Sequence, residues 1–139
     1  MPGSLDCPFH KADEILTKLK NKVKALVVDF HAEATSEKIA FGLYLDGRVS
    51  AVCGTHTHVQ TADERILPGR TAYISDIGMT GPADSIIGVK ADLVIKKYLT
   101  QLPRRFEVAP GPYQFNAVVI EIDAQTGESG SIVRIANNE

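Results

Sequence analysis

The sequence predicts an α/β protein in which helices pack against one mixed sheet. In the first hundred residues, apolar strand-like runs alternate with helix-like segments, whereas the tail is rich in β-forming residues. A turn within that tail predicts a C-terminal β-hairpin. A chain of 139 residues is of single-domain size, so we expect one domain over 1–139.

The first half of the chain predicts two helices and two strands after a turn-rich start at residues 1–9. The expected elements are a helix from Asp6 or Pro8 to Lys20, a strand at 25–31, a helix from Thr35 or Ser36 to Leu45, and a strand at 49–53. The strand at 25–31 is apolar on both faces until Asp29, which predicts a buried strand.

The second half begins with a strand and a loop and then changes character. We expect a strand at 71–75, a glycine-rich loop at 76–82, a helix at about 91–101, and β-rich segments at 105–108, 114–122 and 131–135. The turn at 123–128 joins the last two segments as a hairpin. No internal repeat or low-complexity segment interrupts this order.

Charge and composition exclude several classes of partner. With 15 Lys and Arg against 17 Asp and Glu, the formal charge is −2 and no basic block exists. Stable binding to a nucleic acid backbone is therefore not expected. A small anionic substrate remains compatible if a metal ion supplies local positive charge.

No apolar run reaches the ~18 residues that a membrane span needs, so we expect no membrane association. The two cysteines, Cys7 and Cys53, give neither a disulfide framework nor a zinc knuckle. Cys53 lies in an apolar run and is expected to be buried. A reducing cytoplasm is the expected location.

Polar side chains gather where the strand at 25–31 ends. In an extended backbone Asp29, His31 and Glu33 share one face, and functional sites of α/β sheets lie beyond the carboxyl ends of strands. Asp29 and Glu33 could each orient a ligating imidazole, or they could simply be solvated.

A second pair of candidates follows the strand at 49–53. His56 and His58 share a face when the chain is extended, and imidazole ligands favour Zn, Mn or Fe over Mg or Ca. A His-x-His pattern is weak evidence alone, whereas two strand ends that both carry histidine strengthen it. We expect Thr55 and Thr57 to serve strand and turn formation. The N–H groups of Gly78, Thr80 and Gly81 could approach a phosphate, although such a segment is more often only a loop.

Three longer motifs together resemble the YmdB-type metallophosphoesterases of the calcineurin-like superfamily. They are VDFHAEATSEK at 28–38, GRV through GTHTHVQTAD at 47–63, and DIGMTGP at 76–82. The resemblance runs from Leu5 to Ile135 and implies a four-layer α/β/β/α sandwich with a two-metal site of Fe, Mn or Zn. It implies that His31 and His56 bind one metal, that His58 binds the other, and that a metal-bound hydroxide hydrolyses phosphoesters such as 2′,3′-cyclic nucleotides.

The chain departs from this family in length. Members are roughly twice as long, and their first half supplies metal-binding carboxylates and an Asn-His pair whose histidine protonates the leaving group. No Asn-His pair occurs here, so the catalytic proton donor is unknown and the chain corresponds to the C-terminal half of the fold. Asp29, Glu33 or Asp76 could substitute for a missing carboxylate, and the chain could hold two metals, one or none.

Three functions stay open at this point. The first is half of a two-metal phosphodiesterase, which a homo-oligomer or a separate N-terminal half would complete. The second is a non-catalytic metal-binding or protein-interaction module. The third is a mononuclear metal hydrolase in which His31, His56 and His58 hold one zinc ion and Glu33 acts as the base.

Overall fold

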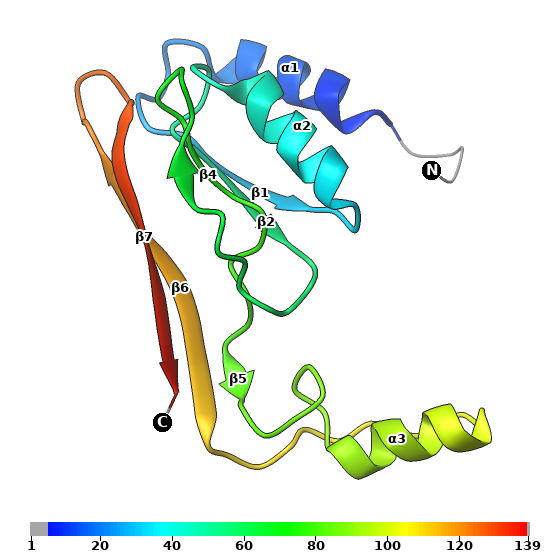
Figure 1. Cartoon of the computed structure of the whole chain (residues 1–139). Coiled ribbons are helices and arrows are strands. Elements are labelled where there is room, and N and C mark those ends of the chain that lie inside the picture. Colours follow the sequence, from blue (N-terminus) through cyan, green and yellow to red (C-terminus); the bar gives the residue numbers. More distant parts are fainter. Residues whose placement is uncertain (1–5, 139) are drawn as a thin grey trace.

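The computed structural model describes residues 6–138, so the first five residues of the turn-rich start predicted at 1–9 lie outside them. The elements in chain order are α1 (Pro8–Leu19), β1 (Val27–His31), α2 (Thr35–Leu45), β2 (Ala51–Thr55), β3 (Arg65–Ile66), β4 (Ala72–Ile74), β5 (Gly81–Pro82), α3 (Ala91–Thr100), β6 (Tyr113–Ile122) and β7 (Ser129–Asn138). Figure 1 shows a layered body of helices and strands from which α3 projects.

The first sheet is mixed, as predicted. Its strand order is β1-β2-β4-β3, with β1, β2 and β4 parallel and β3 antiparallel to β4. Because parallel neighbours end at the same edge, His31 at the end of β1 pairs in register with Thr55 at the end of β2. This register fixes where the histidines after each strand emerge.

Helices α1 and α2 cover one face of this sheet (Figure 1). The core beneath them contains Phe41, Leu45, Val52 and Tyr73, with Phe30 stacked on Phe41 at 4.0 Å between ring centroids. Alternate residues of the same strands point to the other face, where Ala51, Cys53, Ala72 and Ile74 form a second core.

The second core is closed by the β6–β7 hairpin, which the sequence predicted. These strands pair antiparallel from Gln114–Asn138 to Ile122–Ser129, and β5 pairs with the start of β6. Val118, Ile120 and Ile132 of the hairpin pack on the second core. The fold is therefore α/β/β, which confirms the mixed α/β class, and residues 6–138 do not build a second helical layer outside the hairpin.

Two expectations about strands were wrong. The strand at 25–31 was expected to be buried, but β1 alternates between exposed and half-buried residues, and Val27 is 56% exposed. The reason is that β1 lies at the sheet edge and the hairpin contacts β3 and β4 instead. Residues 105–108 form no strand, since only Val108 makes an isolated bridge, to Val89. Nearby Pro103, Pro110 and Pro112 lack the N–H that a ladder needs.

The described helices include none with the length and apolarity that a membrane crossing requires. Cys53 is buried, as predicted, and burial raises the pKa of its thiol to about 11, with a smaller contribution from the Asp29 charge.

Candidate functional site

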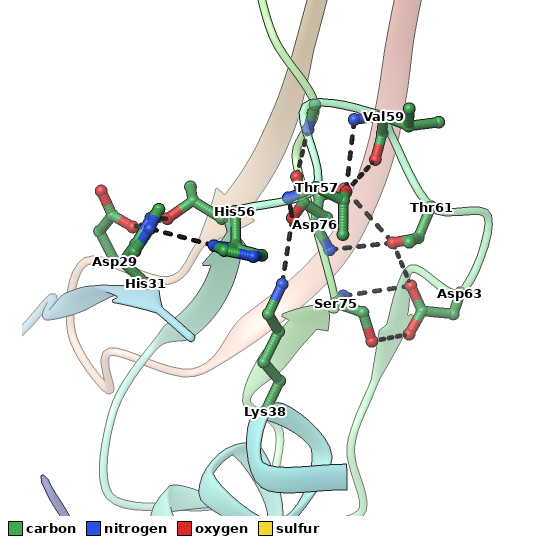
Figure 2. A network of polar contacts seen from close by, with 12 residues as sticks. Asp29, His31, Lys38, His56, Thr57, Val59, Thr61, Asp63, Ser75 and Asp76 are labelled. Atoms are coloured by element: carbon green, nitrogen blue, oxygen red, sulfur yellow. Dashed lines mark hydrogen bonds and ion pairs between the residues drawn. The ribbon is translucent and has the colours of Figure 1, made fainter. Parts of the chain in front are cut away.

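The site begins with two imidazoles that meet at the carboxyl edge of the parallel sheet. His31 ends β1, and His56 directly follows β2. Nε2 of His31 lies 3.3 Å from Nδ1 of His56, and both rings are exposed (Figure 2). The parallel register of β1 and β2 is the cause of this meeting, because it brings the two strand ends side by side.

A hydrogen-bonded relay behind His31 sets its tautomer. Thr55 Oγ1 donates to Oδ1 of Asp29 at 3.0 Å, because an ionised carboxylate has no hydrogen to give. The same Thr55 oxygen lies 3.1 Å from Nδ1 of His31 and must therefore accept from the Nδ1–H. Nε2 of His31 is left with its lone pair directed at His56.

The distance between the two ring nitrogens is the distance expected for two ligands of one metal ion. Two nitrogens bound tetrahedrally to one zinc ion at 2.0–2.1 Å are about 3.3–3.4 Å apart, and the observed separation is 3.3 Å. The free lone pair of His31 is the donor that such a cation requires. The described residues thus fit part of a coordination shell.

The other predicted ligands do not join this pair. His58 and Glu33 are exposed, and Glu33 lies beyond the end of β1, which stops at His31. Within residues 6–138, no group of three or more His, Cys, Asp and Glu side chains is arranged to hold a metal ion. The structure therefore brings His31 and His56 together, with Asp29 behind them, and leaves His58 apart.

Asp76, which was predicted as a possible metal ligand, is buried and already paired. Its side chain is 1% exposed and accepts from Nζ of Lys38 at 3.0 Å, from the Thr57 N–H at 2.8 Å and from the Gly78 N–H at 2.9 Å. Burial alone would raise the pKa of Asp76, but the two backbone N–H groups and the Lys38 ammonium outweigh it and lower that pKa. Asp76 is a buried anchor for the loop that carries the histidines (Figure 2).

That loop holds unfavourable backbone angles. His56 has φ 140° and His58 has φ 62°, both in the positive region that side chains other than glycine rarely adopt. Such backbone angles persist only where contacts with the surrounding structure hold them in place. Thr57 lies between the two histidines, and its N–H is held by Asp76.

Glycines fit the backbone tightly around the site. A Cβ atom on Gly54 would overlap the carbonyl oxygen of Ser75, so β2 approaches the end of β4 more closely than any side chain would allow. Gly78 has φ 77°, and its N–H is already bound by Asp76. Two other residues belong to the predicted phosphate loop. Thr80 is exposed, and Gly81 of β5 pairs with Gln114 of β6.

Sequence reasoning missed the roles of Lys38 and Thr55. Lys38 lies on the buried face of α2 with Phe41, Gly42 and Leu45, at the spacing of one helix face. A lysine within that apolar face was the sequence feature that could have indicated a buried ion pair. Thr55 was assigned to strand and turn formation, and nothing in its spacing to Asp29 and His31 gave its bridging position.

An open groove runs beside the site, along the outer edge of β1. It has a volume of about 400 Å³ and lies between α1 and β1. The lining is mostly apolar and includes Ile15, Leu16, Val27 and Val28, together with Asp29 of the relay. The edge of β1 that faces away from β2 has no strand beside it among residues 6–138.

Comparisons with known proteins show the family of the chain. A family model described as "YmdB-like protein" matches residues 1–135. A 2′,3′-cyclic-nucleotide 2′-phosphodiesterase from Bacillus subtilis is 56% identical over 135 residues, which are 97% of this chain and 51% of the relative.

Two solved structures have the same fold. One, a hypothetical protein from Thermus thermophilus, gives a TM-score of 0.90 at 42% identity over 99% of this chain and 53% of its own. The other, a novel phosphatase from Mycoplasma pneumoniae, gives a TM-score of 0.89 at 38% identity over 99% of this chain and 49% of its own. The chain spans about half the length of the proteins it matches.

Proposed function

Because this chain belongs to the YmdB-like family, we propose that it supplies half of the active site of a metal-dependent phosphodiesterase that hydrolyses 2′,3′-cyclic nucleotides. The observation that carries the proposal is the pair formed by His31 Nε2 and His56 Nδ1, 3.3 Å apart at the carboxyl edge of the sheet. The Bacillus subtilis relative, a 2′,3′-cyclic-nucleotide 2′-phosphodiesterase by name, supports the substrate class.

In this proposal His31 and His56 hold one Fe, Mn or Zn ion between them, and His58 binds a second. A bound cation supplies positive charge for the phosphate and acidifies a water molecule. Thr55 and Asp29 keep the Nδ1–H of His31 engaged, so its Nε2 stays free to ligate. Neutral imidazoles hold a cation without cancelling the charge that attracts the phosphate.

The buried pair of Lys38 and Asp76 fixes the loop between the two histidines. Asp76 holds the Thr57 N–H, and a rigid loop keeps His56 at its distance from His31. Positioned ligands matter because a displacement of about 1 Å can cost 10²-fold in rate. We assign Lys38 and Asp76 this positioning role and give them no contact with substrate.

The remaining ligands come from a complementary half, and the edge of β1 is where we place it. Parallel sheets are almost always covered on both faces, and an exposed strand edge can pair with another chain through its free N–H and C=O groups. β1 is exposed, unpaired on one side among residues 6–138 and bordered by the apolar groove. A separate N-terminal half or a second copy that adds a strand there would lie beside Asp29 and His31. Both described cysteines are free, in keeping with a cytoplasmic location.

The test is complementation. The chain is mixed with the part of the Bacillus subtilis relative that the match leaves uncovered, and hydrolysis of 2′,3′-cyclic AMP is measured with Mn²⁺. We expect turnover from the mixture that His31→Ala or His56→Ala abolishes. His10→Ala removes an exposed histidine of α1 and should leave turnover unchanged. A stable complex without turnover would contradict the proposal.

A second function is favoured by one observation, the lack of a third ligand beside the histidine pair in residues 6–138. A chain that keeps the fold but acts only as a metal-binding or protein-interaction module would bind Mn²⁺ or Zn²⁺ weakly through His31 and His56. It would give no turnover even when the complementary half is bound. The complementation experiment therefore separates the two functions directly.

A further inference from the structure

Gln60 is the last residue of the loop that carries His56 and His58, residues 56–60, which we call the histidine loop. Its Nε2 donates to the carbonyl oxygen of Ala117 at 2.9 Å, and it lies 3.3 Å and 3.4 Å from two further backbone carbonyls, those of residues 77 and 135. Residues 117 and 135 face each other in the β6–β7 hairpin, and residue 77 follows β4. One side chain therefore ties the histidine loop to the hairpin and to the segment after β4.

The carbonyls fix the orientation of the Gln60 amide. A carbonyl oxygen only accepts hydrogen bonds, so the group that faces it must be the NH₂ group. Oε1 of Gln60 is thereby turned the other way, where it is buried without a hydrogen-bond partner among residues 6–138. A buried acceptor without a partner costs free energy, and it is uncommon in folded proteins. The fold thus keeps the contacts of Nε2 in spite of that cost.

Before Gln60 the histidine loop makes a tight turn with His58 at its apex. Thr57 Oγ1 donates to the Val59 carbonyl at 2.8 Å and accepts from the Val59 N–H at 3.3 Å (Figure 2). His58 has φ 62°, a conformation that a histidine keeps only where the surrounding structure holds it. The orientation of His58 therefore depends on what holds the two ends of the turn.

Both ends of the turn are held by the body of the protein. At one end the Thr57 N–H donates to Asp76 at 2.8 Å, and at the other end Gln60 is bound to the hairpin. Close packing strengthens the second anchor, since a Cβ atom on Gly78 would lie 2.8 Å from the backbone nitrogen of Gln60. Because His58 itself is exposed, its direction is set mainly through the backbone.

We propose that Gln60 is a positioning residue for His58. Its amide holds the end of the histidine loop on the hairpin and so fixes the direction of the His58 imidazole. This inference rests on the proposed function, in which His58 is the ligand of the second metal ion. Gln60 itself contacts neither metal nor substrate, because its amide nitrogen is bound to backbone carbonyls.

The first test uses the chain alone, without metal or substrate. Gln60→Met keeps the length of the side chain and removes its donor. We expect the ¹⁵N order parameters of His58 and Val59 to fall from about 0.85 to below about 0.6, whereas that of Val52 in β2 stays unchanged. Gln60→Asn, whose amide is one methylene too short to reach Ala117, should give the same loss if Gln60→Met does not fold.

Asn116→Ala is the matched control. It removes another half-buried amide of the hairpin, which donates to the Met79 carbonyl and does not hold the histidine loop. The order parameter of His58 should therefore stay as in the wild type. An unchanged value for His58 in Gln60→Met overturns the proposal. An equal loss at Val52 also overturns it, because Gln60 would then only support the fold.

The second test uses the chain mixed with its complementary half. For Gln60→Met we expect the Mn²⁺ concentration that gives half-maximal turnover to rise at least about tenfold, because a metal ligand has lost its support. Excess Mn²⁺ should restore kcat, and the KM for 2′,3′-cyclic AMP should stay unchanged. A loss of kcat that excess Mn²⁺ does not restore overturns the proposal. A wild-type mixture without turnover would overturn the proposed function instead, and the order parameters would still decide whether Gln60 holds the loop.

Discussion

Lys38 and Asp76 form an ion pair of 3.0 Å in which the two side chains are 3% and 1% exposed. The lysine comes from α2 and the aspartate follows β4, so the pair joins the helical layer to the edge of the sheet. Because Asp76 also accepts from the Thr57 N–H, the pair reaches the backbone between His56 and His58. Fold stability and site geometry therefore depend on the same contact.

Lys38→Met should be strongly destabilising. The substitution leaves the Asp76 carboxylate buried without its counter-ion, which typically costs about 3–5 kcal/mol of the free energy of unfolding. Urea denaturation followed by circular dichroism measures the change. As the control, Lys90→Met breaks the solvent-exposed pair with Glu107 and should have no measurable effect. Equal effects of both variants would show that the buried pair has no special role.

The stability of the chain should fall in acid. The pKa values of Asp63 and Asp76 are both lowered, because hydrogen bonds to their carboxylates outweigh the opposing effect of burial. A carboxyl whose pKa is lower in the folded state stabilises the fold above its unfolded pKa, about 3.9. We expect the unfolding free energy to be level between about pH 5 and pH 7 and to decrease as the pH drops below about 4.

Asp63→Asn tests the source of this acid dependence. It removes one carboxyl whose oxygens accept from the Ser75 N–H, the Ser75 hydroxyl and the Thr61 hydroxyl. Its unfolding free energy should fall less steeply below about pH 4 than that of the wild type. Identical slopes would mean that other carboxyls carry the acid sensitivity.

Gly54→Ala should disrupt the strand edge that carries the site. A Cβ atom at Gly54 would overlap the backbone of Ser75 and contact Lys38, so β2 and β4 must separate at a cost of about 3 kcal/mol or more. Gly130→Ala is the matched control, because Gly130 is also a strand glycine and no atom lies within 4 Å of a Cβ there. Thermal denaturation measures the stability of both variants. A Gly54→Ala variant as stable as the wild type would refute this packing.

Thr55→Val should change the tautomer of His31 while it preserves the shape of the strand. The wild type holds the proton on Nδ1 of His31, since that nitrogen must donate to Thr55. Without the hydroxyl we expect a mixture of Nδ1–H and Nε2–H forms, which two-bond ¹H–¹⁵N spectra of the imidazoles resolve. An unchanged Nδ1–H signal in Thr55→Val would show that the relay does not set the tautomer.

Local patterns in the sequence predicted that His31 and His56 follow strand ends, and the family resemblance predicted that the two share one metal. Two apolar runs, each followed by histidine and separated by a helical segment, indicate adjacent parallel strands with both histidines at one edge. The helices at α1, α2 and α3 and the β6–β7 hairpin followed from periodicity and turn residues in the same way. Each of these features depends on spacings of a few residues.

The contacts that support the site were beyond such patterns. Lys38 and Asp76 are 38 positions apart, and Asp29 and Thr55 are 26 apart, so their pairing is decided by how α2 and β1 pack on the sheet. The two-residue strands β3 and β5 carry no periodic signal of their own. The exposure of β1 was missed because an apolar run predicts burial, whereas an edge position depends on strand order.

The most direct test of the proposed metal site is whether His31 and His56 bind the same cation. ¹⁵N-labelled histidine spectra are recorded while Zn²⁺ is added to the chain. Nε2 of His31 and Nδ1 of His56 should shift together with one dissociation constant, and the proton of His56 should settle on its Nε2. His56→Ala should weaken binding at His31, whereas His10→Ala should not. Two results would contradict the proposed site. One is a zinc titration that shifts the His31 signals while those of His56 stay in place. The other is a zinc affinity at His31 that His56→Ala leaves unchanged.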